Sequence, residues 1–159
     1  MLKERIKKKN ILSNGKKILL LKSLFNVKPE KFGWDDVAQQ IVGAFLLSAP
    51  FAVTEEVWEL SQSLNIFRII FLIFFTILIS ILIIYYTEFQ KVAIERVGKT
   101  YIPKRLLSLL LISYLTSFFV LWMFGVIGNQ IKDLKWSLKL VIFVSFFSSL
   151  GASTADILK

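Results

Sequence analysis

Three carboxylates close an apolar run at residues 43 to 60, GAFLLSAPFAVTEEVWEL, and they are the first candidates for chemistry. They are Glu55, Glu56 and Glu59. The chain contains no cysteine and no histidine, which excludes disulfides, thiolate chemistry and imidazole ligands or acid–base catalysis. Any chemistry must therefore use carboxylates, hydroxyls, amines or backbone groups. Fixed negative charges beside a membrane-like run are typical of the mouth of a cation pathway.

Helical spacing places two of these carboxylates on a face of small side chains. That face consists of Ala44, Ser48 and Ala52. At about 100° per residue, Glu55 and Glu59 fall within its arc, and Glu56 lies just outside it. Nineteen residues separate Asp36 from Glu55, about 28 Å of helix, so we expect Glu55 close to the outer interface. The competing interpretation is a wet acidic end at the surface.

A fourth carboxylate, Asp156, lies on a similar face at the end of the chain. There it shares helical spacing with Ser145, Ser149 and Ala152. The segments SAPFAVTEE and SSLGASTAD, residues 48–56 and 148–156, also agree at four of nine positions. Because the first and last spans run in opposite directions, this similarity suggests an inverted repeat, as in many transporters. The candidate ion-pathway residues are Glu55, Glu56, Glu59, Asp156, Ser48 and Thr54.

The composition places these residues in a bilayer. Of 159 residues, 55% are hydrophobic, and the mean hydropathy of +0.65 is far above that of a soluble domain. Four segments have the roughly 20 apolar residues that a spanning helix needs. They are residues 37–60, 66–86, 106–128 and 136–158. The predicted fold is all-α, a polytopic membrane protein with a transmembrane domain of four helices over residues 34–159.

Two features predict how these spans pack. The second span is hydrophobic on all sides, so we expect much of it to face lipid. The third and fourth carry small and hydroxyl residues at helical spacing, a pattern that favours helix packing over a polar conduit. These residues are Ser113, Thr116, Ser117, Ser145, Ser148, Ser149 and Ala152.

The distribution of lysine and arginine predicts the orientation. Ten basic residues precede the first span, five lie between the second and third, and Lys159 ends the chain. The opposite side receives Arg68, Lys132, Lys135 and Lys139. Sixteen against four predicts a multi-pass protein of the cell membrane with both termini in the cytoplasm.

Residues 1–33 form a separate basic segment. Leu20, Leu21, Leu24 and Phe25 share one helical face, and lysines occupy the others. We expect an amphipathic helix on an anionic leaflet rather than a signal peptide or a nucleic-acid-binding arm. The lysines expected to bind lipid are Lys7, Lys8, Lys9, Lys16, Lys17 and Lys22.

The run QQIVGAFLLSAPFAVTEEVW, followed later by FFSSLGASTADIL, resembles domain of unknown function 2391, a family of integral membrane proteins. In that family's pattern an early span begins with Gly-Ala, has a proline in mid-helix and ends in Thr-x-Glu-x-Trp. Gly43, Ala44, Pro50, Thr54, Glu56 and Trp58 occupy these places. The resemblance implies a membrane protein and no particular reaction.

The sequence argues against an enzyme. EEVWEL is similar to the Glu-Glu-x-x-x-Arg signature of membrane-embedded prenyl-protein proteases, but Leu60 replaces the arginine and the histidines are absent. Asp156 lacks the Gly-x-Gly-Asp context of an intramembrane aspartyl protease, and no phosphate loop or dinucleotide fingerprint occurs. We therefore expect no catalysis, no cofactor and no metal site.

Two classes of function remain. The first is a homo-oligomeric channel or small carrier for monovalent or divalent cations, with the acidic end of the first span at the outer mouth. The second is a structural or regulatory membrane subunit that binds partner helices and anionic lipid. The sequence favours transport by a small margin.

Overall fold

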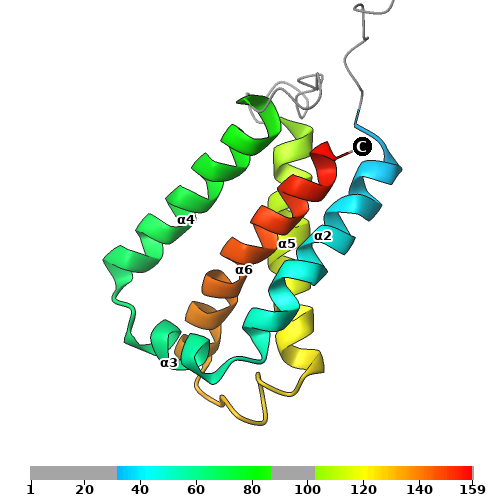
Figure 1. Cartoon of the computed structure of the whole chain (residues 1–159). Helices are drawn as coiled ribbons and strands as arrows, with labels where there is room; N and C mark the ends of the chain where they lie inside the picture. Colours follow the sequence, from blue (N-terminus) through cyan, green and yellow to red (C-terminus); the bar gives the residue numbers. More distant parts are fainter. Residues whose placement is uncertain (1–31, 87–102, 159) are drawn as a thin grey trace, which may run out of the picture.

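The computed structural model describes residues 32–86 and 103–158, whose regular elements are all helices (Figure 1). In chain order these are α2 (Trp34–Ala52), α3 (Glu55–Ser63), α4 (Ile66–Ile81), the π-helix η1 (Leu82–Tyr86), α5 (Lys104–Met123) and α6 (Leu134–Ile157). Three of these stretches are long and apolar enough to cross a membrane, namely Ile66–Tyr86, Lys104–Met123 and Leu134–Ile157. A fourth crossing is counted if α2 and α3 form one bent span.

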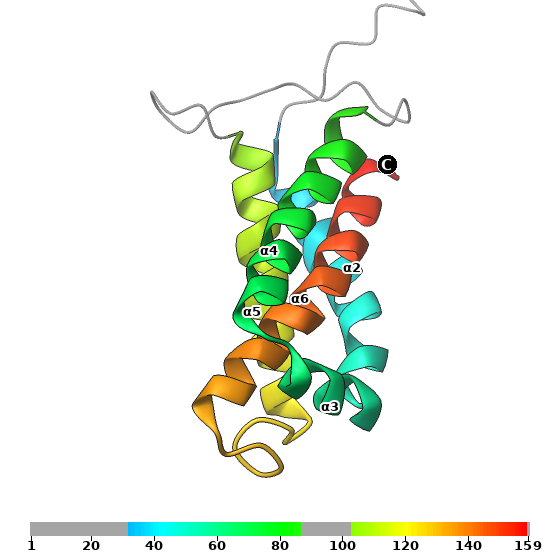
Figure 2. The same ribbon diagram turned by 90° about the vertical axis from the view of Figure 1, so that its left-hand side faces the viewer.

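Helices α2, α5 and α6 pack against one another and form the core (Figures 1 and 2). The start of α2, the start of α5 and the end of α6 lie at one end of this bundle, here called the charged end. The opposite end, here called the α3 end, carries α3 and the turn between α5 and α6.

The closest helix contact is between α2 and α6, which run antiparallel. A Cβ atom added to Gly43 would collide with the carbonyl oxygen of Gly151, and one added to Gly151 would collide with that of Gly43. Such close backbone approach is the usual role of small residues in membrane helices. Small side chains of both helices also lie in this contact, including the buried Ala44, Ser48 and Ala152.

This confirms that the small-residue stripe of the fourth span serves helix packing. All four of its residues, Ser145, Ser148, Ser149 and Ala152, are fully buried. In the third span Ser113 and Ser117 are buried as well, whereas Thr116 is only partly covered.

The expected first span, residues 37–60, is not one straight helix. α2 ends at Ala52, two residues after Pro50, and α3 begins at Glu55 after a bend of 87°. Proline removes one backbone hydrogen bond and permits such a break near a helix end. Glu55 and Glu56 then lie in the first turn of α3, where the helix dipole favours negative charge.

Two tryptophans and a lysine fix α3 across the end of the bundle. The Trp58 indole donates to the Ala52 carbonyl at 2.8 Å, and the Trp136 indole donates to the Trp58 carbonyl at 2.9 Å. Lys139 Nζ donates to the carbonyls of Gln62 and Leu64 at 3.1 and 2.6 Å. The carbonyls of Ala52 and Gln62 are among those that helix ends leave without intrahelical partners.

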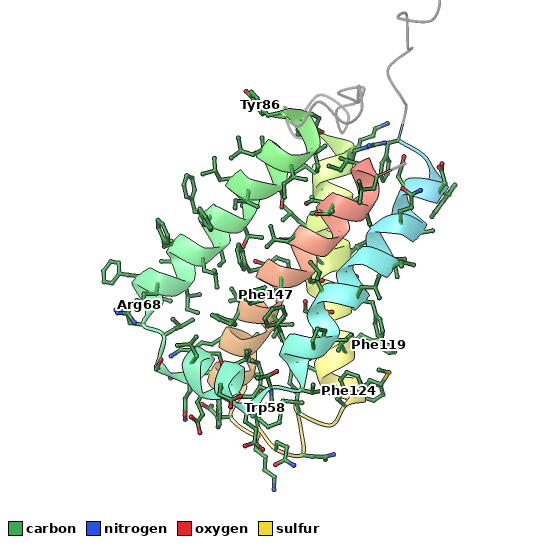
Figure 3. The ribbon with its side chains drawn as sticks, viewed as in Figure 1. Trp58, Arg68, Tyr86, Phe119, Phe124 and Phe147 are labelled. Carbon is green, nitrogen blue, oxygen red and sulfur yellow. The ribbon has the colours of Figure 1, made fainter. Side chains whose placement is uncertain are left out.

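α4 and η1 flank these three helices and contact mainly α6, and Ile84 of η1 joins the core beside Ala44 and Leu109. Ile69, Thr76, Ser80 and Ile84 form the buried side of this stretch, and most other side chains are exposed. This exposure is what the prediction of a lipid-facing second span requires, and contact with lipid itself stays a prediction. Figure 3 shows Arg68 at the free-standing end of α4, directed away from the bundle.

The third span is shorter than expected, because α5 ends at Met123 and not at residue 128. Gly125 and Gly128 have φ values of +72° and +97°, which non-glycine residues rarely adopt. The chain turns there, and Val126 and Ile131 fold back into the core beside Leu121 and Leu140.

Candidate functional site: a buried charged cluster

A cluster of charged side chains is buried where α2, α5 and α6 meet at the charged end. Arg105 Nη2 lies 3.0 Å from Asp36 Oδ2, and Arg105 Nη1 lies 3.2 Å from Asp156 Oδ2. The two aspartates are fully buried and the arginine is 2% exposed. One guanidinium therefore joins carboxylates from two other helices.

Neutral side chains extend this cluster on α2 and α5. Gln40 Nε2 donates to Asp156 Oδ1 at 3.0 Å, and Ser108 Oγ donates to Gln40 Oε1 at 3.0 Å. Asp36 Oδ2 also accepts the backbone N–H of Gly33 at 2.7 Å, at the start of α2. Buried polar groups are costly unless they are hydrogen-bonded, so these contacts make burial of the charges tolerable.

Helix dipoles explain why Arg105 is essential to the arrangement. Asp36 lies in the first turn of α2, where a negative charge is favoured. Asp156 lies in the last turn of α6 and Arg105 in the first turn of α5, and each has the sign that its own helix end disfavours. The attraction between Arg105 and Asp156 offsets both unfavourable placements.

The guanidinium also has an aromatic neighbour. Its Cζ atom lies 6.0 Å from the centre of the Phe32 ring, within the range of a cation–π contact. Its contacts with the carboxylates are ion pairs by distance, without hydrogen-bond geometry among the described residues.

The three glutamates of the acidic end lie on another part of the molecule. Glu55, Glu56 and Glu59 are all exposed on α3, at the opposite end from Asp156. The prediction that Glu55 and Glu59 share the face of Ala44, Ser48 and Ala52 is wrong, because the 87° bend ends that face at Ala52. The interpretation as a wet acidic surface fits this placement.

The hydroxyls of the predicted ion pathway act within their own helices. Ser48 is buried and donates to the Phe45 carbonyl at 3.3 Å. Thr54 donates to the Pro50 carbonyl at 2.7 Å and so covers the end of α2. The structure does not gather the six candidate pathway residues at one place. The described residues also contain no group of acidic side chains that could hold a metal ion.

The proposed inverted repeat has no structural counterpart. Residues 48–56 contain the break between α2 and α3, whereas residues 148–156 lie within the continuous helix α6. Glu56 is exposed, and its partner in the alignment, Asp156, is buried in an ion pair. The similarity reflects a shared use of small residues, which both helices need for their mutual contact.

The expected lipid-binding lysines, Lys7, Lys8, Lys9, Lys16, Lys17 and Lys22, lie outside the described residues, as does the rest of the amphipathic segment up to residue 31. That prediction stays a prediction.

The partners of Asp156 were not predicted, although the sequence carries a signal of them. The small-residue face of α2 continues upstream at intervals of four, and all five of its positions are buried. They are Asp36, Gln40, Ala44, Ser48 and Ala52. A polar residue on the buried face of a membrane helix indicates a polar partner on a neighbour. In the sequence, Arg105 follows Lys104 and looks like one more basic residue of a cytoplasmic loop. Nothing in that local pattern indicates that Arg105 is buried whereas Lys104 is exposed.

Comparison with known proteins gives one match. The family model described as "Putative integral membrane protein (DUF2391)" matches residues 13–158. No curated protein and no solved structure matches the chain. The matched range includes the charged cluster, the glycine contact and α3.

Proposed function

Because this chain belongs to the DUF2391 family of integral membrane proteins, we propose that it is a non-catalytic membrane subunit that binds lipids and partner helices through its outer surface. In this proposal the core formed by α2, α5 and α6 holds that surface in a fixed shape. The charged cluster joins the three helices at one end, and α3 closes the other.

The observation that carries this proposal is the contact of Gly43 with Gly151. The face of small and hydroxyl side chains that could have lined a passage is used up in packing α2 against α6. A bundle of three or four spans encloses little interior, and buried side chains of α2, α5 and α6 fill it. Stacked rings of Phe51 and Phe147, with centroids 3.7 Å apart, join the same two helices.

The outer surface supports a binding role. Large apolar side chains remain exposed along α2, α4 and α5, as expected of helices in contact with lipid or with other helices. The proposal places both termini and the basic segment at residues 1–33 on the cytoplasmic side, where anionic lipids attract lysine and arginine.

Transport is the second candidate function, and the buried charges favour it. Ionisable residues inside membrane proteins commonly mark ion or proton pathways. A cation channel or carrier would need several copies of this chain around a shared axis, because the small-residue face is occupied within one copy. Asp156 would then serve that pathway only in a state in which its pair with Arg105 opens.

Flux measurements in liposomes separate the two functions. Purified protein is reconstituted with a cation-sensitive dye inside, and flux is recorded for the parent, Glu55→Gln and Asp156→Asn. We expect all three to match protein-free liposomes. Cation flux that the parent supports and Asp156→Asn abolishes, with unchanged reconstitution, would overturn the subunit proposal and establish transport.

A further inference from the structure

A groove between α2 and α5 opens on the outer surface of the bundle. Its volume is about 470 Å³. Ile41, Val42, Phe45 and Leu46 of α2 line one wall, and Ile112, Leu115, Thr116 and Phe119 of α5 line the other. Thr116 is the one polar side chain among them. An apolar groove on a membrane helix bundle faces hydrocarbon.

We propose that this groove binds one acyl chain of an anionic phospholipid whose head group lies beside Lys104. The proposal depends on the chain's place in a membrane and not on the function proposed above. Three features of the described residues carry it: the chemistry of the groove walls, their register along α5 and α2, and the residues that stand at the charged end.

The walls suit an acyl chain better than a second helix. Helices associate in membranes where small residues allow their backbones to approach closely. Thr116 is the one such residue in the lining of the groove, and the others are branched or aromatic side chains. A flexible hydrocarbon chain can follow such a surface, and it gains dispersion contacts along its whole length.

The face of α5 that lines the groove also carries a lysine at its start. On α5 the wall residues Ile112, Leu115 and Phe119 continue the helical face of Lys104 and Ser108, at spacings of three and four residues. Lys104 is exposed in the first turn of α5, about 12 Å along the axis from Ile112. A lysine at that level can extend to a lipid phosphate, as lysines near helix ends do.

The α2 wall ends in the same way. Trp34 lies two helical turns before Ile41 on the same face and is 88% exposed. Tryptophan favours the head-group level of a bilayer, so it marks the depth at which the phosphate would lie. Between the levels of Lys104 and Ile112, the hydrogen bond from Ser108 to Gln40 joins α5 to α2.

The test measures retained lipid by native mass spectrometry of the full chain, purified in detergent and titrated with phosphatidylglycerol or phosphatidylcholine. Val42→Trp intrudes on the groove, and Ile70→Trp is its control, since the parent residues are 57% and 58% exposed. Lys104→Gln removes the cation, and Lys135→Gln is a control at the α3 end. Unfolding temperatures of all four variants establish that each is folded.

We expect the parent to retain one phosphatidylglycerol. Lys104→Gln should weaken that retention about fivefold, the effect of one basic residue near an anionic head group. Val42→Trp should weaken it for either lipid, and the two controls should match the parent. Equal retention by Val42→Trp and Ile70→Trp, or equal retention of the two lipids by the parent, would overturn the proposal.

A photo-crosslinking amino acid at Phe45 distinguishes the occupant directly. An adduct with phospholipid supports the proposal. An adduct with a second copy of the chain or with another membrane protein shows that a helix fills the groove and overturns it.

Discussion

Gly43 and Gly151 face each other across the contact of α2 and α6, each occupying the space that a side chain on the other would need. The nearest atoms to a Cβ at either position include backbone carbonyl atoms, which cannot move aside without moving a helix. The distance between these two helices is therefore fixed by the absence of two methyl groups.

Gly151→Ala and Gly43→Ala should each destabilise the folded chain. Alanine favours helix formation by about 1 kcal/mol over glycine, but the clash with backbone should outweigh this gain and lower the free energy of unfolding by about 1–3 kcal/mol. Chemical unfolding in detergent micelles measures the change. Ala38→Val, which adds atoms to an exposed position of α2, is the control. Higher stability of either glycine variant would contradict this account of the contact.

The sequence predicted the apolar spans and the role of their small residues, because both depend on local pattern. The bounds of the second span and the burial of Ser145, Ser148 and Ser149 follow from composition and spacing alone. The bend after Ala52 does not. A proline is tolerated near a helix end with or without a break, and here the docking of Trp58 and Trp136 stabilises the broken form.

The local sequence pattern could not predict the partners of Asp156 either, for a different reason. Asp36, Arg105 and Asp156 are far apart in the chain, and each stands near the end of its span, where charge is ordinary. Only the packing of three helices shows that these particular charges are buried. Lys139 is a similar case, since the sequence placed it on the outer side but not at the end of α3.

Lys139→Gln should release α3 from α6. The lysine supplies charge-assisted hydrogen bonds to the Gln62 and Leu64 carbonyls, and such bonds contribute about 1.5–3 kcal/mol. We expect faster amide hydrogen exchange across residues 53–65 and little change in α5. Lys135→Gln, one turn earlier on α6, is the control. Unaltered exchange in α3 would mean that Trp58 and Trp136 suffice to hold it.

Each glutamate of α3 should tolerate replacement by glutamine. Since Glu55, Glu56 and Glu59 are all exposed, replacement of any one by glutamine should alter the free energy of unfolding by less than about 0.5 kcal/mol. Thermal unfolding of the three single variants checks this. A larger effect confined to Glu55 would indicate that this carboxylate has a protected environment in the membrane-bound protein.

The topology prediction can be checked with reporter fusions. The excess of basic residues before α2 and between η1 and α5 predicts that the charged end faces the cytoplasm. A reporter protein that is active only in the cytoplasm should be active when it is fused after Lys159. A tag inserted between Ser63 and Ile66 should be accessible from outside the cell. An external C-terminus would reverse the assignment of both ends of the bundle.

Removal of Arg105 should be the most damaging single change at the charged end. Arg105→Met leaves Asp36 and Asp156 buried without the guanidinium that lies 3.0 and 3.2 Å from them. Breaking a buried pair in this way costs about 3–5 kcal/mol, because the remaining charge is uncompensated. We expect a matching loss in the free energy of unfolding in detergent, whereas Arg68→Met, at an exposed position of α4, should have little effect.

A second substitution shows whether charge is the cause. Asp156→Asn in the Arg105→Met background removes one of the two buried carboxylates and keeps a side-chain oxygen that can accept from Gln40. The double variant should therefore be more stable than Arg105→Met alone, although Asp156→Asn by itself should destabilise the parent. A double-mutant cycle isolates this coupling between the two residues. If the two losses simply add, the guanidinium acts by filling space, and its charge does not hold the three helices together.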